Sequence, residues 1–259
     1  MAFATTVDVG VAAGLHAALY GAYKDSPHES FLARRFVREL VIATCVAAAL
    51  ATSPLVDGQT SFVLYVSIFA LSRIATEYWK LFLRVEPQEG FRIPTQVHLA
   101  RRIVRNAIGR QLLGVGWLAG IYGCYSLLTL LPDSLPPVAA GAVVGGTIGL
   151  GIACCGGYKD GTIEGFSWPK FAKSPTFGAF GGAIAGLHTT SLPFLVLAAV
   201  GTERMLNELL FKILRAGYVP GKFPSMTAAC PDWQRRRTIF LIPYAATWAL
   251  YLVLLAGAR

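Results

Sequence analysis

Eight long apolar segments constrain this chain more than any other feature of its sequence. Most have roughly the length that a helix needs to cross a bilayer, about 17 to 25 residues, and those at 7–22 and 176–190 are short for a full span. Only 14% of the 259 residues are charged, against about 25% in an ordinary soluble domain, so too little polar surface remains to cover a water-soluble globule. The sequence therefore predicts an all-α integral membrane protein of about eight transmembrane helices, at residues 7–22, 40–54, 61–79, 109–131, 137–157, 176–190, 191–210 and 238–257.

The basic residues test this arrangement, because the cytoplasmic loops of membrane proteins carry an excess of Lys and Arg. All of the 23 Lys and Arg residues except Arg73, Arg204 and Arg259 fall in four alternate connections between the segments. This pattern predicts eight crossings of a bacterial or organellar inner membrane, with the basic loops in the cytoplasm, matrix or stroma and both termini on the opposite side. The net charge of +9 then reflects topology and contact with anionic lipids, and no nucleic-acid partner is expected.

The chain also repeats itself internally. Charged and aromatic residues of the first half fall on the same residue types in the second half, and such matches arise by chance less often than matches of Leu or Ala. The two units, residues 1–133 and 134–259, each contain four apolar segments, so both enter the membrane from the same side. The sequence predicts two parallel four-helix repeats related by a pseudo-twofold axis along the membrane normal. At an offset of 135, Tyr23, Lys24, Asp25 and Glu29 match Tyr158, Lys159, Asp160 and Glu164, and at an offset of 131, Arg73, Glu77 and Trp117 match Arg204, Glu208 and Trp248.

The first candidate site is the Tyr-Lys-Asp-x-x-x-Glu segment that both units carry at the inner end of their first helix. Twofold symmetry could bring the two copies together near the axis, where the carboxylates could hold a divalent cation and the lysines a phosphate or carboxylate. The alternative is that Tyr and Lys anchor the helix at the membrane interface while the acids pair with nearby basic residues. The candidate residues are Tyr23, Lys24, Asp25, Glu29, Tyr158, Lys159, Asp160 and Glu164, with the cation at Asp25, Glu29, Asp160 and Glu164.

The second candidate site is an Arg and a Glu four residues apart in the third helix of each unit, Arg73 with Glu77 and Arg204 with Glu208. At this spacing two side chains meet on one helix face. Arg73 lies about 18 Å along its helix, inside a hydrocarbon layer about 30 Å thick, where a charge is costly unless it is paired and turned toward protein or water. We expect both arginines to point inward and to bind a carboxylate, with Glu77 and Glu208 as the first choice. The alternatives are a structural salt bridge and a pair that snorkels to the interface.

Two further residue types receive simpler interpretations. Glycines four residues apart, as at Gly10 and Gly14 or Gly145 and Gly149, predict close helix packing. The histidines lie far apart, and none aligns with a histidine of the other unit, so no metal site through histidine is expected. They are His16, His28, His98 and His188.

These features favour a membrane transporter or channel with a polar pathway between the repeats, for an anionic solute or a lipid headgroup, because substrate sites of duplicated transporters lie at the repeat interface. One alternative is a membrane-embedded enzyme that acts on a lipid-linked substrate at the cytoplasmic face, with the paired acids as metal ligands or acid–base groups. Another is a non-catalytic subunit of a larger membrane complex, and a homo-oligomer is also compatible with the sequence. Apart from the divalent cation, no cofactor is predicted, since no nucleotide-binding or hydrolase motif occurs.

Overall fold

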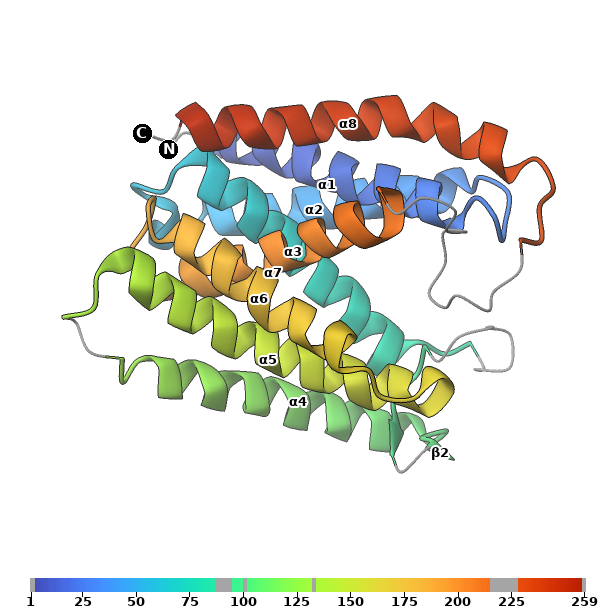
Figure 1. Ribbon diagram of the computed structural model, residues 1–259, viewed down its shortest axis with the longest axis horizontal. Helices are drawn as coiled ribbons and strands as arrows, with labels where there is room; N and C mark the ends of the chain where they lie inside the picture. Colours follow the sequence, from blue (N-terminus) through green and yellow to red (C-terminus); the bar gives the residue numbers. More distant parts are fainter. Residues whose placement is uncertain (1–2, 87–94, 100–101, 132–133, 215–227, 258–259) are drawn as a thin grey trace.

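The computed structural model describes residues 3–86, 95–99, 102–131, 134–214 and 228–257. Within this part of the chain, eight α-helices run back and forth along one long axis (Figure 1). The predicted all-α class is therefore confirmed. The helices are α1 (Phe3–Asp25), α2 (Ala33–Ala51), α3 (Ser61–Tyr78), α4 (Ala107–Leu128), α5 (Pro137–Glu164), α6 (Trp168–Ala185), α7 (Leu192–Glu208) and α8 (Trp233–Gly257).

Short elements connect or extend these helices. A 3-10 turn, η1 (Pro54–Val56), follows α2, and a two-stranded antiparallel hairpin, β1 (His98–Leu99) and β2 (Arg102–Ile103), precedes α4. Two π-helical segments continue the third helix of each predicted unit, η2 (Trp79–Leu83) after α3 and η4 (Leu209–Ile213) after α7. A π-helical turn is rare and is frequently found at functional sites.

Helix ends follow local sequence signals. Thr60 caps α3 by accepting a hydrogen bond from the N–H of Val63 at 3.3 Å, and Asn106 caps α4 by accepting one from the N–H of Ile108 at 2.9 Å. These side-chain oxygens satisfy N–H groups that have no partner inside the helix. The observed start of α3 at Ser61 therefore agrees with the apolar block predicted at 61–79.

Four of the described helices are long and apolar enough to cross a membrane, by length and composition: α1, α4, the first 22 residues of α5 (Pro137–Tyr158) and α8. This set is compatible with an integral membrane protein. It is a coarser result than the eight crossings predicted from the sequence, because α2, α3, α6 and α7 are not among these four.

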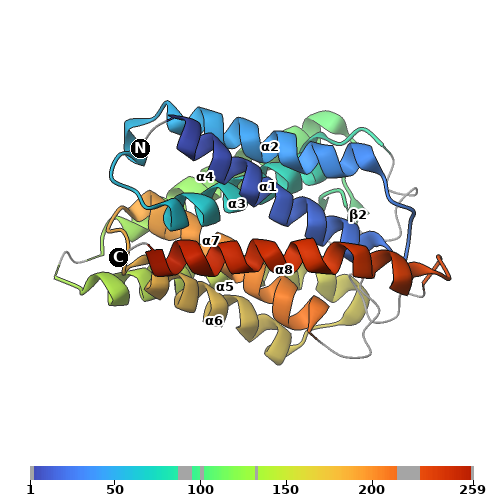
Figure 2. The same ribbon diagram turned by 90° about the horizontal axis from the view of Figure 1, so that it is seen from above.

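The helices are arranged around a central pair. Helices α3 and α7 pack against each other, α1 packs against α2, α3 and α8, and α5 packs against α6 and α7. Figure 1 shows α1, α2 and α8 on one side of this pair and α4, α5 and α6 on the other. Figure 2 shows α8 beside α1 from a perpendicular direction. Residues far apart in the sequence therefore meet at α3.

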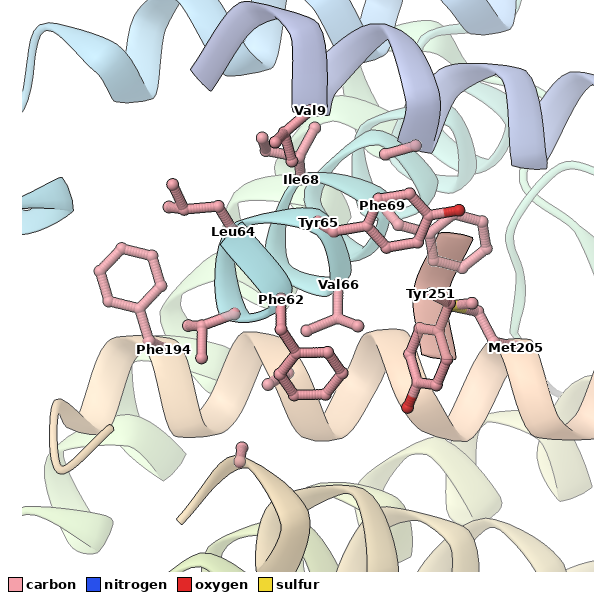
Figure 3. Close-up of a cluster of buried hydrophobic side chains, with 14 of the residues drawn as sticks. Val9, Phe62, Leu64, Tyr65, Val66, Ile68, Phe69, Phe194, Met205 and Tyr251 are labelled. Atoms are coloured by element: carbon pink, nitrogen blue, oxygen red, sulfur yellow. The ribbon is translucent and has the colours of Figure 1, made fainter. Parts of the chain in front are cut away.

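Helix α3 forms the centre of the core. Its residues from Phe62 to Ala70 are each 0–1% exposed, so every face of this stretch is covered by protein. Figure 3 shows Phe62, Tyr65 and Val66 between α1 and α7, with Phe194, Met205 and Tyr251 around them. A helix that is buried on all sides can carry polar residues without exposing them to lipid.

Helices α5 and α6 approach closely through their glycines. A methyl group added at Gly145 would overlap the carbonyl of Gly178, and one added at Gly141 would overlap the carbonyl of Gly182. The backbones meet only because these positions lack a side chain.

Candidate functional site

A pocket with nine charged side chains in its lining lies at the end of the bundle where α1 ends and α2 and α8 begin. Its volume is about 100 Å³, and its apolar wall includes Ala17, Ala18, Phe36 and Phe240. We call it the basic pocket, because its lining contains six cationic and three acidic residues. They are Lys24, Arg35, Arg38, Arg73, Lys80 and Arg236, and Asp25, Glu29 and Glu39.

The first copy of the Tyr-Lys-Asp-x-x-x-Glu segment borders this pocket. The Nζ atom of Lys24 lies 2.5 Å from Oδ1 of Asp25, and Arg35 forms an ion pair with Glu29. Tyr23 is buried, and the guanidinium of Arg237 lies 5.3 Å from the centre of its ring. Asp25 and Glu29 are therefore each paired with a cationic side chain nearby in the sequence, Lys24 and Arg35.

The second copy lies elsewhere. The hydroxyl of Tyr158 donates a hydrogen bond to the carbonyl of His98 at 3.0 Å, and the two rings stack with centres 5.2 Å apart. Lys159, Asp160 and Glu164 belong to α5, but their side chains lie outside the described part of the structure. The C-terminal ends of α1 and α5 lie apart in the bundle (Figure 1), so the two copies of this segment are not neighbours.

The predicted divalent cation has no complete ligand set among the described residues. No group of three or more His, Cys, Asp or Glu side chains suited to a metal ion occurs there. Asp160 and Glu164, two of the four predicted ligands, are outside that comparison. The cation site at Asp25, Glu29, Asp160 and Glu164 thus stays a prediction.

Arg73 links three helices at the inner wall of the basic pocket. One guanidinium nitrogen lies 3.6 Å from Glu39 Oε2 on α2 and the other 3.8 Å from Glu208 Oε1 on α7. Glu77, which the sequence favoured as the partner of Arg73, forms an ion pair with Lys80 at 3.1 Å. The difference arises because α3 and α7 are in contact, which brings a carboxylate of α7 to an arginine of α3.

Arg204 lies in a similar acidic environment on α7. The carboxylates of Glu203, Glu208 and Glu77 are within its electrostatic range. Glu203 is 1% exposed, and its Oε1 accepts hydrogen bonds from Ser174 Oγ at 2.6 Å and from Asn207 Nδ2 at 3.4 Å. We call the six charged residues around the contact of α3 and α7 the charged cluster: Glu39, Arg73, Glu77, Glu203, Arg204 and Glu208.

The sequence did not single out Glu39 or Glu203 as a matched pair, although the repeat contains a signal for them. At an offset of 135, Glu39 aligns with Ser174, and at an offset of 131, Ser72 aligns with Glu203. Each predicted unit therefore has one Glu and one Ser at these positions of its second and third helices, in exchanged order. All four side chains are less than 9% exposed. Because each Glu aligns with a Ser, neither position is an identity between the two halves of the sequence.

Lys80 gives the basic pocket a cation whose charge depends on pH. It lies in η2, beyond the end of α3. Its pKa is lowered from 10.5 to about 8, chiefly by burial and also by the nearby charges of Arg73 and Lys24, while Glu77 opposes the shift. Burial disfavours the charged ammonium because it removes water from it. The pocket therefore loses positive charge as the pH rises through about 8.

The fold and site together fit the class of helical membrane proteins with a polar site inside the bundle. Four helices have the length and composition of membrane spans, and charged side chains of α2, α3 and α7 turn toward one another. Comparisons with known protein families, with curated proteins and with solved structures found no match.

Proposed function

We propose that this protein is a membrane transporter for an anionic solute or a lipid headgroup, which binds in the basic pocket. The observation that carries this proposal is the excess of cationic over acidic side chains in the pocket lining, six against three. Guanidinium and ammonium groups are the side chains that bind phosphate and carboxylate most strongly, through charge-assisted hydrogen bonds. The apolar wall at Phe36 and Phe240 suits the hydrocarbon part of an amphiphile or an organic acid.

The proposal includes two parallel four-helix units with a pathway between them, at residues 1–133 and 134–259. Three features support it. Helices α3 and α7, the third helices of the two units, pack against each other, each continues into a π-helical segment, and each carries one of the aligned arginines. A pseudo-twofold axis along the membrane normal would pass through this contact. Substrate sites of duplicated transporters lie at such an interface.

The proposal also includes eight crossings, although only four described helices are apolar enough by composition alone. Protein covers much of α3 and α7, so their charged residues can face other helices. A span of this kind need not be apolar throughout, because its neighbours replace lipid. The positive charge of alternate connections supports the basic loops being cytoplasmic, or in a matrix or stroma, with anionic lipids at that face.

The contacts of the acids favour transport over the alternative of a membrane-embedded enzyme. Asp25 and Glu29 are each bound to a cation, and Glu39 is bound to Arg38 and Arg73. A carboxylate that already has such a partner is a counter-ion, which an entering anion can replace. Metal ligation or acid–base chemistry would instead require these acids to be available.

The binding test uses a matched pair of neighbouring arginines. Arg35 lines the basic pocket, whereas Arg34 is exposed and does not. Binding of inorganic phosphate and of succinate to the full chain in nanodiscs is measured by calorimetry. Arg35→Gln should weaken binding by about tenfold or more, since a hydrogen bond to a charged group contributes about 1.5–3 kcal/mol, and Arg34→Gln should change it less than about twofold.

Transport assays in liposomes separate the two sources of the anion. Uptake of labelled phosphate or succinate would indicate a free solute, and translocation of fluorescent phosphatidylglycerol would indicate a lipid headgroup. Either activity, reduced by Arg35→Gln and retained by Arg34→Gln, supports the proposal. Equal loss in both variants, or no binding and no translocation by the wild-type protein, contradicts it.

A further inference from the structure

His16 lies in the middle of α1 and is completely buried, with 0% exposure. Its ring contacts those of Tyr65 and Phe69 on α3 and of Tyr244 and Trp248 on α8, with ring centres 4.8–6.3 Å apart. A buried imidazole is costly unless its nitrogens form hydrogen bonds. The transport function proposed above does not use this histidine, so its position requires a separate explanation.

The hydrogen bonds around His16 define which nitrogen carries the proton. Nδ1 lies 3.0 Å from Thr247 Oγ1 and 3.2 Å from Tyr65 Oη. The only proton of the Thr247 hydroxyl is donated to the carbonyl of Tyr244 at 2.7 Å, so Thr247 can only accept from His16. Nδ1 therefore carries the proton of the neutral ring, and Nε2 is an unprotonated, basic nitrogen.

Nε2 of His16 forms no hydrogen bond with the described residues, although it is buried. Two atoms of the rings around His16, Tyr244 Oη and Trp248 Nε1, are likewise buried and form no hydrogen bond with the described residues. Buried polar atoms nearly always have a partner, and a group of them that lacks one points to a bound water or to a proton-transfer role. A basic nitrogen in such a group can accept a proton.

A line of polar groups connects this group to the basic pocket. The phenol groups of Tyr20 and Tyr244 lie within electrostatic range of Glu208, Glu208 lies beside Arg73, and Arg73 lines the pocket. Glu208 Oε2 is also buried without a hydrogen bond from the described residues. These ionisable side chains therefore form a series from His16 toward the pocket, packed among apolar residues such as Leu19 and Leu209.

Polar groups continue on the other side of His16, toward the end of the bundle where α1 begins and α8 ends. The rings of Tyr65 and Tyr251 have centres 6.3 Å apart, and Figure 3 shows both hydroxyl groups inside the core. Ser67 on α3 and Thr202 on α7 also carry buried hydroxyl groups. His16 thus lies between the polar groups on its pocket side and the buried hydroxyl groups of Tyr65 and Tyr251 on its other side.

We infer that a proton pathway runs through His16 from the basic pocket to the opposite end of the bundle, and that anion movement through the pocket is coupled to proton movement. The inference rests on the proposed transport function and names its coupled ion. A proton from the pocket side binds Nε2 and forms an imidazolium. The Nδ1 proton passes to Tyr65 Oη while the Tyr65 hydroxyl releases its own proton toward the far side. The ring is left neutral with its proton on Nε2, and rotation of the ring turns the unprotonated Nδ1 toward the pocket side, where it accepts the next proton.

Several charged and titratable groups lie around His16 and influence its exchange of protons. They come from each helix that packs against it or follows in the line: Tyr20 on α1, Tyr65 and Arg73 on α3, Tyr244 on α8 and Glu208 on α7. Histidine is the residue best suited to exchange a proton near neutral pH.

The test measures proton entry into liposomes that contain the full chain and a pH-sensitive dye. A potassium gradient with valinomycin drives the protons, with and without inorganic phosphate or succinate outside. His16→Gln keeps a polar side chain but cannot carry a proton, and it should lower the protein-dependent proton flux by at least about tenfold. His188→Gln is the control, because His188 also contacts an aromatic ring, Phe62 at 5.2 Å, near the end of the bundle.

A second variant keeps the test decisive if His16→Gln folds poorly. His16→Ala leaves space for a small molecule, and added imidazole should restore proton flux in this variant but not in His16→Gln, whose side chain fills that space. Tyr65→Phe keeps the ring and removes the hydroxyl, so it should also slow proton flux. Wild-type flux in folded His16→Gln, no rescue by imidazole, or no proton flux in the wild-type protein under any of these conditions would overturn the inference.

Anion binding separates this inference from the proposed function. Phosphate and succinate binding should be unchanged in His16→Gln, because His16 does not line the basic pocket. Anion transport without His16-dependent proton flux would leave the transporter proposal intact and reject the proton pathway. Proton flux that depends on His16, without any anion binding, would support the pathway through His16 but reject the coupling and the transporter proposal.

Discussion

At the scale of single residues, Arg73 has the most consequential position. Its guanidinium lies between carboxylates of α2 and α7, and its side chain is only 16% exposed. A buried ion pair contributes little net stability, because desolvation opposes the attraction between the charges, but removing one partner leaves an uncompensated charge. Arg73 therefore connects α3 to α2 and α7, so a substitution at this position affects the packing of all three helices.

Substitution of Arg73 alone should destabilise the protein more than substitution of Arg73 and its partner Glu208 together. Arg73→Met leaves Glu39 and Glu208 without this cation and should lower the free energy of unfolding by about 3–5 kcal/mol. The double variant Arg73→Met and Glu208→Leu should recover part of this loss. Unfolding in a denaturing detergent measures both. The interhelical pair would be unsupported if the loss of unfolding free energy in the double variant equalled the sum of the losses in the two single variants within about 0.5 kcal/mol.

At the scale of elements, helix boundaries show what local sequence can predict. The apolar blocks expected at 61–79 and 109–131 correspond to α3 at Ser61–Tyr78 and α4 at Ala107–Leu128. The block expected at 40–54 corresponds to α2, which begins seven residues earlier, at Ala33. The difference arises because the first turns of α2 carry Arg34, Arg35 and Arg38, which are helical but not apolar. Hydropathy locates the apolar part of a helix and misses a charged end.

The contact of α5 and α6 leads to a prediction with an internal control. Gly145 faces the backbone of Gly178, whereas Gly151 on the same helix has open space around the position of a Cβ atom. Gly145→Ala should therefore destabilise the protein by about 1–3 kcal/mol through overlap with α6. Gly151→Ala should be neutral or stabilising by up to about 1 kcal/mol, because Ala favours a helix.

Thermal unfolding of the two alanine variants in the same detergent makes this comparison. The close approach of α5 and α6 would be contradicted by equal stabilities, since helix propensity alone predicts the same small effect at both positions.

At the scale of the whole molecule, the alternating direction of the helices bears on topology. The connections after α2 and before α6 are predicted to lie on opposite sides of the membrane. Single cysteines at Asp57 and Ser167, in a variant without the five native cysteines, should react with an impermeant maleimide from opposite sides. Asp57 follows η1 and Ser167 precedes α6, and both are exposed. Labelling of both positions from one side would contradict eight crossings.

The sequence by itself determined the helical class, the approximate positions of the helices, and the connections that carry positive charge. These properties depend on composition and periodicity over some twenty neighbouring residues, which each segment possesses alone. The sequence also singled out Arg73, Arg204 and the first Lys-Asp segment as charges with unusual positions.

Only the tertiary structure decided which of these residues meet. Arg73 and Glu208 come together because α3 and α7 are in contact, and Lys24 and Arg236 share a pocket because α8 returns beside α1. His16 had no evident role in the sequence, since its hydrogen-bonding partners Tyr65 and Thr247 are 49 and 231 residues away. Packing between distant helices depends on which faces fit together, and that choice belongs to the whole chain and not to any local segment.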